Sequence, residues 1–219
     1  MTHDRQLTAA ILAGGQARRF GGINKGTLPL GGAHIVDRQL AALRAVAGSV
    51  FVVGAAAPVW SARGLTVVPD EIPGMGPLGG IYTAIVRSPS DRTLVVACDM
   101  PFLSAEVLVR MAAIDDADLV IPKSARGHEP LCAIYTRACL PDIRARLARG
   151  ALQARRLPLG LRIAEIGPDL LGMDERLFVN VNTPHDYERA KGLIELKPVP
   201  TEDRITTDAA GRHSHDPDH

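Results

Sequence analysis

Short apolar runs alternate with stretches of helical spacing along most of this 219-residue chain, and this alternation constrains its fold most strongly. Runs rich in Val, Leu and Ile at residues 7–12, 50–53, 65–68 and 93–98 are typical of buried strands. Between them, apolar residues recur at three- and four-residue intervals, as over 33–47, which predicts helices. We therefore expect an α/β fold of three layers, Rossmann-like, with a mostly parallel central sheet covered on both faces.

The chain is predicted to form one domain over residues 1–197, followed by a disordered C-terminal tail over 198–219. The domain is long enough to bury a sizeable core. From Lys197 onward Pro, Thr, Asp and His dominate without an apolar period, which is typical of disorder. Further strands are expected at residues 119–121, 131–135, 161–166 and 178–182, and further helices at 58–63, 82–86, 104–113, 141–149 and 183–196. Ser104 is a candidate N-cap, Thr183-Pro184-His185-Asp186 fits a capping box, and a glycine-rich loop is expected over 73–80.

Composition excludes several classes of function. The net charge of +1 gives no basic surface for nucleic acid or for an anionic membrane. No apolar run approaches the roughly 20 residues of a membrane helix, and the first residues do not resemble a signal peptide. Cys98, Cys132 and Cys139 form no close C-x-x-C pair. Reduced, buried thiols and a cytoplasmic location are therefore expected.

A glycine-rich segment, Leu12-Ala13-Gly14-Gly15, ends the first apolar run, and Arg18, Arg19 and Lys25 follow it. Glycine lets the backbone turn sharply and bring its N–H groups against an anion, and the basic residues add positive charge. The dinucleotide fingerprint is absent, and Lys25-Gly26 does not fit a phosphate-loop NTPase. A plain turn with solvated arginines is the alternative, but this density of glycine and basic residues favours a phosphate site.

Two carboxylates follow apolar runs in the same way. Asp99 comes directly after 93–98 and could hold Mg²⁺, which prefers a few carboxylates together with phosphate oxygens. It could equally cap a helix or form a turn, because Pro101 follows. Asp70, after 65–68, could be a second ligand, could accept from a base or ribose, or could be a turn residue. Parallel strands place all these features at one edge of the sheet, where ligands bind in such folds.

Other polar residues are weaker candidates. Arg155-Arg156 could clamp a phosphate, although the pair by itself would favour a solvated helix face. Asn180 and Asn182 alternate with valines, so both amides are expected on one strand face, where they suit the edge of a heterocycle. His128-Glu129 resembles an acid–base pair but lacks a placed nucleophile, so lining or turn roles are favoured. Asp116-Ala117-Asp118 fits a metal motif but is expected on the opposite side of the sheet.

Taken in order, these motifs resemble the molybdenum cofactor guanylyltransferase family, which has a nucleotidyltransferase fold. The resemblance extends over residues 7–196 and implies an enzyme that transfers GMP from GTP to the terminal phosphate of molybdopterin, releasing pyrophosphate. It is carried by Leu12-Ala13-Gly14-Gly15 with Arg19 and Lys25, Asp70, Gly76-Pro77-Leu78-Gly79-Gly80-Ile81, Cys98-Asp99-Met100-Pro101 and Asn180-Val181-Asn182-Thr183-Pro184.

The resemblance also implies roles for particular residues. Lys25 and Asp99 would be catalytic, with Mg²⁺ as cofactor on Asp99, and molybdenum-insertion and molybdoenzyme-maturation proteins are the implied partners. Leu12, Ala13, Gly14, Lys25, Asp70 and Asp99 would bind GTP, and the phosphate site predicted above includes Gly15 and Arg19. Arg156, Asn180 and Asn182 would face molybdopterin.

Three positions depart from the family pattern: Asn24 and Gly79 stand where Asp and Ala are usual, and Gly54 stands where some members have Asn. We expect a preference for GTP over CTP, because small residues in both glycine-rich segments leave room for a purine. The alternatives are a related enzyme that uses CTP or a sugar-phosphate acceptor, and a non-catalytic nucleotide-binding protein. The intact Lys25 and Asp99 argue against the last of these.

Overall fold

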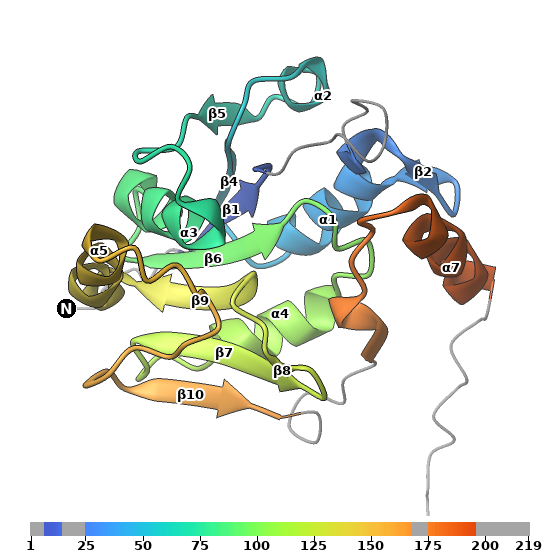
Figure 1. The fold of residues 1–219 in the computed structure, drawn as a ribbon. Helices are drawn as coiled ribbons and strands as arrows, with labels where there is room; N and C mark the ends of the chain where they lie inside the picture. Colours follow the sequence, from blue (N-terminus) through green and yellow to red (C-terminus); the bar gives the residue numbers. More distant parts are fainter. Residues whose placement is uncertain (1–6, 15–24, 168–174, 196–219) are drawn as a thin grey trace, which may run out of the picture.

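An eight-stranded sheet forms the centre of the computed structural model, which describes residues 7–14, 25–167 and 175–195 (Figure 1). The predicted tail therefore lies outside the described residues. Across the sheet the order is β10 (Ile163–Ile166), β7 (Leu119–Ser124), β9 (Cys132–Thr136), β6 (Arg92–Ala97), β1 (Leu7–Leu12), β4 (Ser49–Val53) and β5 (Thr66–Val68), with β8 (Gly127–His128) paired to β7.

The sheet is mostly parallel, as the sequence predicted. β1 runs parallel to both β4 and β6, β4 to β5, and β7 to β10, whereas β9 is antiparallel to both of its neighbours. Leu12, the last residue of β1, is in register with Val53 and with Ala97. The carboxyl ends of three central strands therefore lie level at one edge, and the polar residues that follow them meet there.

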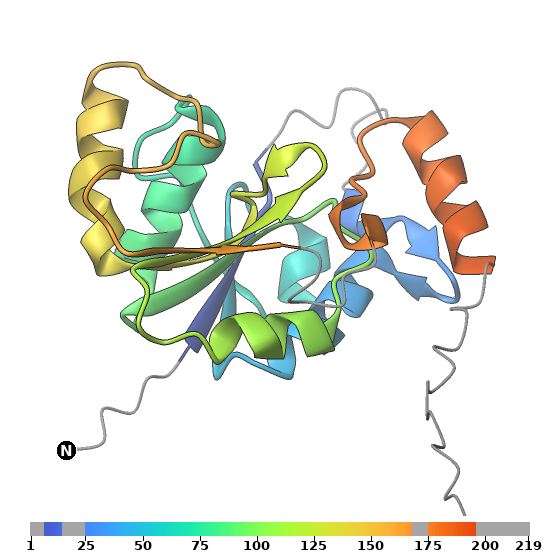
Figure 2. The same cartoon turned by 90° about the horizontal axis from the view of Figure 1, so that it is seen from below.

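Helices cover both faces, which gives the three expected layers (Figure 2). Residues of β1 alternate between the two cores: Ala9 and Ile11 pack with α1, while Ala10 and Leu12 pack with α3. This strand is buried on both sides, which explains why its sequence is apolar at every position except Thr8. One face carries α1 (Ile35–Arg44), α2 (Pro58–Ser61) and α4 (Ala105–Ala112), and the other carries α3 (Gly76–Arg87) and α5 (Leu140–Ala148).

A smaller cluster holds the C-terminal part of the domain beside the sheet. Leu30, Ile35, Val181 and Ala190 are buried together, so α7 packs next to a short hairpin that the sequence did not predict (Figure 1). The remaining elements are β2 (Pro29–Leu30), β3 (Ala33–His34) and α7 (Pro184–Glu195), with short 3-10 helices η2 (Lys25–Thr27), η3 (Arg137–Cys139) and η4 (Glu175–Phe178).

The strand expected at residues 178–182 is wrong. Phe178 ends η4, the Val179 N–H donates to the Arg176 carbonyl as in a helical turn, and the next residues form no strand. The Val181 N–H bonds to the carbonyl of Asp99, 2.9 Å away, and so this segment attaches to a turn instead of a strand edge. Alternating Val and Asn therefore reflects a fully buried Val181 between two half-buried amides, not a sheet ladder.

The helix expected at residues 104–113 is confirmed as α4. The Ser104 hydroxyl accepts from the Val107 N–H and caps α4. Residues 76–80 form the first turns of α3, where a glycine-rich loop was expected. Among the described residues, no helix combines the length and the hydropathy needed to cross a bilayer.

Candidate active site

The first glycine-rich segment begins as an extension of the sheet. The Leu12 carbonyl accepts from the Cys98 N–H at 3.1 Å, and the Ala13 N–H donates to the Val53 carbonyl at 2.8 Å. Beyond this point Gly14 is exposed and has open space around its Cα. The sheet therefore fixes the start of the segment and leaves its glycine facing solvent at the carboxyl edge. Gly15 and Arg19 lie outside the described residues.

Gly54 shapes this segment through its backbone. Its φ is +138°, a region that L side chains rarely adopt, and a Cβ there would lie 3.1 Å from the Ala13 carbonyl carbon. Its N–H donates to the Val68 carbonyl at 2.9 Å. A side chain at this position would therefore push against Ala13 and Gly14, and the glycine lets two strand ends approach each other closely.

Lys25, Asp99 and Asn182 meet at the carboxyl edge, although they come from three distant parts of the sequence. The Lys25 ammonium donates to Asn182 Oδ1 at 2.6 Å and lies 3.6 Å from Asp99 Oδ2. The side chains of Lys25 and Asp99 are only 19% and 16% exposed. Two predicted catalytic residues and one predicted acceptor-side residue therefore form a single contact group.

Asp99 has the character of a cation ligand. Burial raises the pKa of its carboxyl, and the nearby Lys25 ammonium opposes this rise. Its Oδ1 is buried and has no hydrogen-bond partner among the described residues, and the same is true of Asn180 Oδ1. A buried oxygen without a partner is costly unless something binds it. The Asp99 oxygen fits Mg²⁺, and the Asn180 oxygen, which lines the cleft described below, is open to a ligand there.

Within residues 7–14, 25–167 and 175–195, no group of three or more His, Cys, Asp or Glu side chains is placed to hold a metal. The single Asp99 carboxylate, with its buried Oδ1 unpartnered, suits Mg²⁺, which is usually held at phosphate-transfer sites by one or two carboxylates together with water and substrate phosphates.

Asp186 fixes the backbone that carries Asn182. Its Oδ2 accepts from the N–H groups of Asn182 (3.0 Å) and Thr183 (2.8 Å), while its own N–H donates to Thr183 Oγ1. Burial alone would raise the pKa of Asp186, but the hydrogen bonds from Thr183 and Asn182 outweigh it and hold the pKa below its usual range. The capping box predicted at the start of α7 is therefore confirmed, and it anchors the site.

A cleft of about 420 Å³ opens beside this contact group and is lined by both asparagines. Three arginines also line it, on the β7–β8 turn, on η4 and on α7, against one carboxylate, Asp186. The sequence analysis missed these arginines because they come from separate segments and form no motif. The cleft is lined by Ser124, Ala125, Arg126, Arg176, Phe178, Val179, Asn180, Asn182, Asp186, Arg189 and Leu193.

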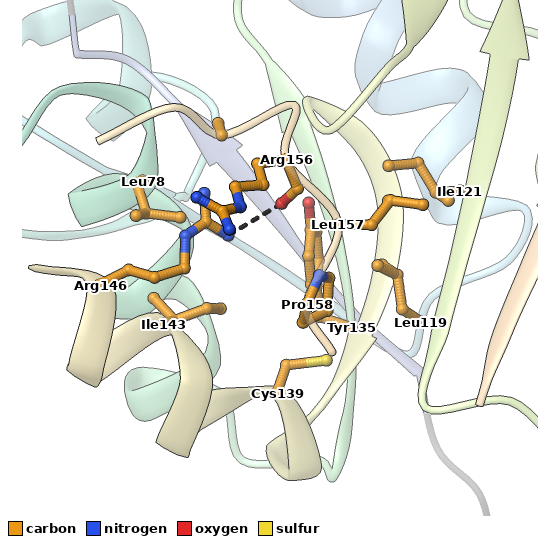
Figure 3. A pocket seen from close by; sticks show the side chains of 11 residues that line it. Leu78, Leu119, Ile121, Tyr135, Cys139, Ile143, Arg146, Arg156, Leu157 and Pro158 are labelled. Carbon is orange, nitrogen blue, oxygen red and sulfur yellow. Dashed lines mark hydrogen bonds between the residues drawn. The ribbon is translucent and has the colours of Figure 1, made fainter. Parts of the chain in front are cut away.

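Arg156 lies away from that cleft. Figure 3 shows it beside Leu78 of α3, with its carbonyl accepting from the buried Arg146, 2.9 Å away. Its neighbour Arg155 instead donates to the Arg126 carbonyl at 2.7 Å. The structure therefore brings Asn180 and Asn182 together but does not place Arg156 with them, and the role of Arg156 stays a prediction.

The remaining candidates separate clearly. Asp70 follows β5 at the same edge as Asp99. Asp118 precedes β7 at the opposite edge, where it pairs with Arg162, as expected for a residue outside the site. His128 pairs with Glu165 on β10 at 3.0 Å. Glu129 accepts from Ser124, so these adjacent residues do not act as a pair.

A three-layer fold that gathers a glycine-rich segment, Lys25, Asp70 and Asp99 at the carboxyl edge of its parallel strands has the architecture of a nucleotidyltransferase. Residues 9–159 match the family model described as "MobA-like NTP transferase domain", and the chain belongs to this family. It is an enzyme of the nucleotidyltransferase class.

The chain is also similar to individual family members. It is 31% identical to "Molybdenum cofactor guanylyltransferase" of Desulfosudis oleivorans, over 86% of this chain and 96% of that protein. It is 33% identical to the "Probable molybdenum cofactor guanylyltransferase" of Pelotomaculum thermopropionicum, over 87% and 94%. The crystal structure of "Molybdopterin-guanine dinucleotide biosynthesis protein A" from Archaeoglobus fulgidus matches with a TM-score of 0.67 and 26% identity, over 86% and 98%.

Proposed function

We propose that this enzyme transfers GMP from GTP to the terminal phosphate of molybdopterin. The observation that carries the proposal is the contact of Lys25 with both Asp99 and Asn182, which links the carboxyl end of β6 to the arginine-lined cleft. Such a junction is what a transfer between two phosphate-bearing substrates requires. The relatives named as molybdenum cofactor guanylyltransferases support this choice of donor and acceptor.

In the proposed reaction, an oxygen of the acceptor phosphate attacks the α-phosphorus of GTP. The bond between this oxygen and the α-phosphorus forms, the bond from the α-phosphorus to the bridging oxygen breaks, and pyrophosphate leaves with the electron pair. The attacking phosphate is already ionised near neutral pH, so no strong protein base is needed. Catalysis then consists of positioning the two substrates and neutralising their charge.

The residues divide this work between them. Backbone N–H groups of the glycine-rich segment and the Lys25 ammonium would bind the triphosphate. Asp99, with its unpartnered buried oxygen, would hold Mg²⁺. Bound there, Mg²⁺ would neutralise charge on the phosphate oxygens of attacking and leaving groups. Asp70 would accept from the guanine base or from ribose. Proteins that insert molybdenum or mature molybdoenzymes are the proposed partners, and the cytoplasm is the proposed compartment.

The arginine-lined cleft would hold the acceptor. Arg126, Arg176 and Arg189 outnumber the carboxylates beside them, Asp186 and Glu129, the latter paired with Arg126 at 3.7 Å. This excess of positive charge suits an anionic ligand that bears a phosphate. Asn180 and Asn182 supply amide groups for the edge of the pterin.

We expect Arg189→Met to raise the KM for molybdopterin about tenfold and to leave the KM for GTP unchanged, because one charge-assisted contact is worth about 1.4 kcal/mol or more. Steady-state kinetics with each substrate varied in turn would measure this. The matched control is Arg144→Met, which removes an exposed arginine on α5 away from the cleft. Equal effects of the two variants, or a rise in the KM for GTP alone, would place the acceptor elsewhere.

A preference for GTP over CTP is expected, with a kcat/KM ratio of at least about a hundredfold. A site that accepts the N1–H and N2–H₂ donors of guanine leaves its acceptors unpaired when cytosine binds. Open space around Gly14 and Gly76 suits a purine. Gly79 and Gly80 were expected to leave room for the purine, but their small size instead allows close packing inside the protein. An added Cβ would lie 2.7 Å from Met75 at position 79 and 3.0 Å from Leu12 at position 80.

Incubation with each of the four NTPs, Mg²⁺ and purified molybdopterin, with mass detection of products, tests donor and acceptor together. Formation of the guanine dinucleotide from GTP is the expected outcome. Equal or better use of CTP would overturn the guanylyl assignment, and product from a sugar phosphate alone would overturn the acceptor. Pyrophosphate release separates every enzymatic outcome from a non-catalytic nucleotide-binding protein.

A further inference from the structure

We infer that Gln39 of α1 is a positioning residue that fixes the turn carrying Asp99 and thereby its affinity for the divalent cation. The Gln39 side chain is fully buried. Its Nε2 donates to the carbonyl of Ala97 at 2.7 Å and to that of Met100 at 3.1 Å. These two carbonyls flank Cys98 and Asp99, so a single amide clamps the turn on both sides.

The acceptors are carbonyls, so Nε2 must donate in both bonds, and both of its hydrogens are used. The turn is held from other directions as well. The Cys98 N–H bonds to β1 through Leu12, and the Asp99 carbonyl accepts from the Val181 N–H at 2.9 Å. Hydrogen bonds from β1, from Val181 and, through Gln39, from α1 therefore all fix the backbone on either side of Asp99.

The surroundings of Gln39 indicate that core packing alone does not account for it. Neighbouring buried positions on α1, including Val36, Leu40 and Leu43, are apolar. Gln39 Oε1 is buried without a hydrogen-bond partner among the described residues, which costs stability that an apolar side chain would not cost. The amide therefore occupies a position where an apolar residue would pack. What the amide adds over an apolar residue is the pair of hydrogen bonds to the turn that carries Asp99.

The adjacent residue on α1 strengthens this hold. Arg38 Nε donates to the carbonyl of Pro101 at 3.2 Å, so α1 binds three carbonyls of the segment 97–101. Partners that orient a metal ligand without touching the metal commonly change metal affinity or activity by about 10- to 100-fold when they are removed. The inference rests on the proposed function, in which Asp99 holds the cation.

The test replaces Gln39 by methionine, which is similar in size and lacks both donors. Mn²⁺ binding to the full-length protein with GTP, measured by electron paramagnetic resonance, is expected to weaken about tenfold or more. The Mg²⁺ concentration for half-maximal activity is expected to rise by a similar factor. Binding of Mn²⁺ without turnover provides a readout that does not depend on activity.

The matched control is Arg92→Met, at the opposite end of the strand that leads to Asp99. Arg92 is also buried, and its guanidinium donates to the carbonyls of Ala112 (2.9 Å) and Ile114 (2.6 Å). Its loss removes the same kind of bond far from the site. We expect Arg92→Met to lower Tm at least as much as Gln39→Met, with Mn²⁺ affinity unchanged.

Unchanged Mn²⁺ affinity in folded Gln39→Met, or an equal loss in the Arg92→Met control, would overturn the inference. If Gln39→Met does not fold, Gln39→Leu, which matches the apolar neighbours on α1 and lacks both donors, is subject to the same criteria. A parallel measurement on Asp99→Asn separates the two proposals. If Asp99→Asn binds Mn²⁺ as the wild type does, both the metal assignment and the inference are overturned. If Asp99→Asn weakens Mn²⁺ binding and Gln39→Met does not, only the inference is overturned.

Discussion

Asp99→Asn is expected to abolish turnover while the protein remains folded. A neutral amide cannot hold Mg²⁺ against a triphosphate as a carboxylate does, and the loss should be about 3 kcal/mol or more of barrier, roughly a hundredfold or more in kcat. Burial raises the pKa of Asp99, so the folded protein bears a cost for its charged form that asparagine removes. Tm is therefore expected to stay the same or to rise. Pyrophosphate release and thermal unfolding measure the two effects.

Asp118→Asn is the control for this prediction. The Asp118 side chain is 16% exposed, as is that of Asp99, but it lies at the other edge of the sheet and pairs with Arg162. Its amide variant is expected to turn over normally. Wild-type pyrophosphate release from folded Asp99→Asn would show that Asp99 is not the metal ligand.

The sheet and the edge that carries the site could be predicted because they depend on local patterns. β1 and β6 are buried along their whole length and mostly apolar, because both of their faces are covered, and such runs identify central parallel strands from sequence alone. Parallel strands then place whatever follows them at one edge, which brought Gly14, Asp70 and Asp99 to the same side. The capping residues of α4 and α7 were equally readable, because a cap depends on residues three positions apart.

The missed parts depend on contacts between distant segments. Alternating Val and Asn at 179–182 fits a strand locally, but the N–H of Val181 finds its acceptor on Asp99, far away in the sequence. The cleft arginines are missed for the same reason, because Arg126, Arg176 and Arg189 come together only once the β7–β8 turn, η4 and α7 are placed. A single sequence carries no local pattern for such a cluster.

Gly79 stands where the family usually has alanine, and the packing around it shows that the two residues are not interchangeable in this chain. An added Cβ at this position would lie 2.7 Å from the Cβ of Met75, so the first turn of α3 has closed around the glycine. The Thr83 hydroxyl donates to the Gly79 carbonyl and accepts from the Glu71 N–H, which ties this turn to the loop after β5. In this chain an alanine there would require Met75 to move, and the loop that carries Asp70 is coupled to that turn.

Lys25→Met is expected to lower kcat/KM for GTP about a hundredfold, the scale for removing one preorganised donor to developing charge. Methionine keeps most of the length of the side chain and removes its charge. The ammonium lies 2.6 Å from Asn182 Oδ1 and 3.6 Å from Asp99 Oδ2, between the two proposed substrate sites. The variant should therefore impair use of both substrates, whereas Arg189→Met impairs only the acceptor. Kinetics with GTP and molybdopterin varied separately would show this difference.

Lys191→Met is the control for the loss of a lysine. Lys191 is exposed on α7, where it pairs with Glu188 at 2.8 Å and lies over the ring of Tyr187. Exposed pairs of this kind contribute little, so normal kinetics are expected. A large fall in Tm for Lys25→Met with normal kinetics in the folded fraction would show that Lys25 serves only the stability of the fold. Impaired kinetics at a similar Tm would instead show that the Lys25 ammonium acts within the site of the folded protein.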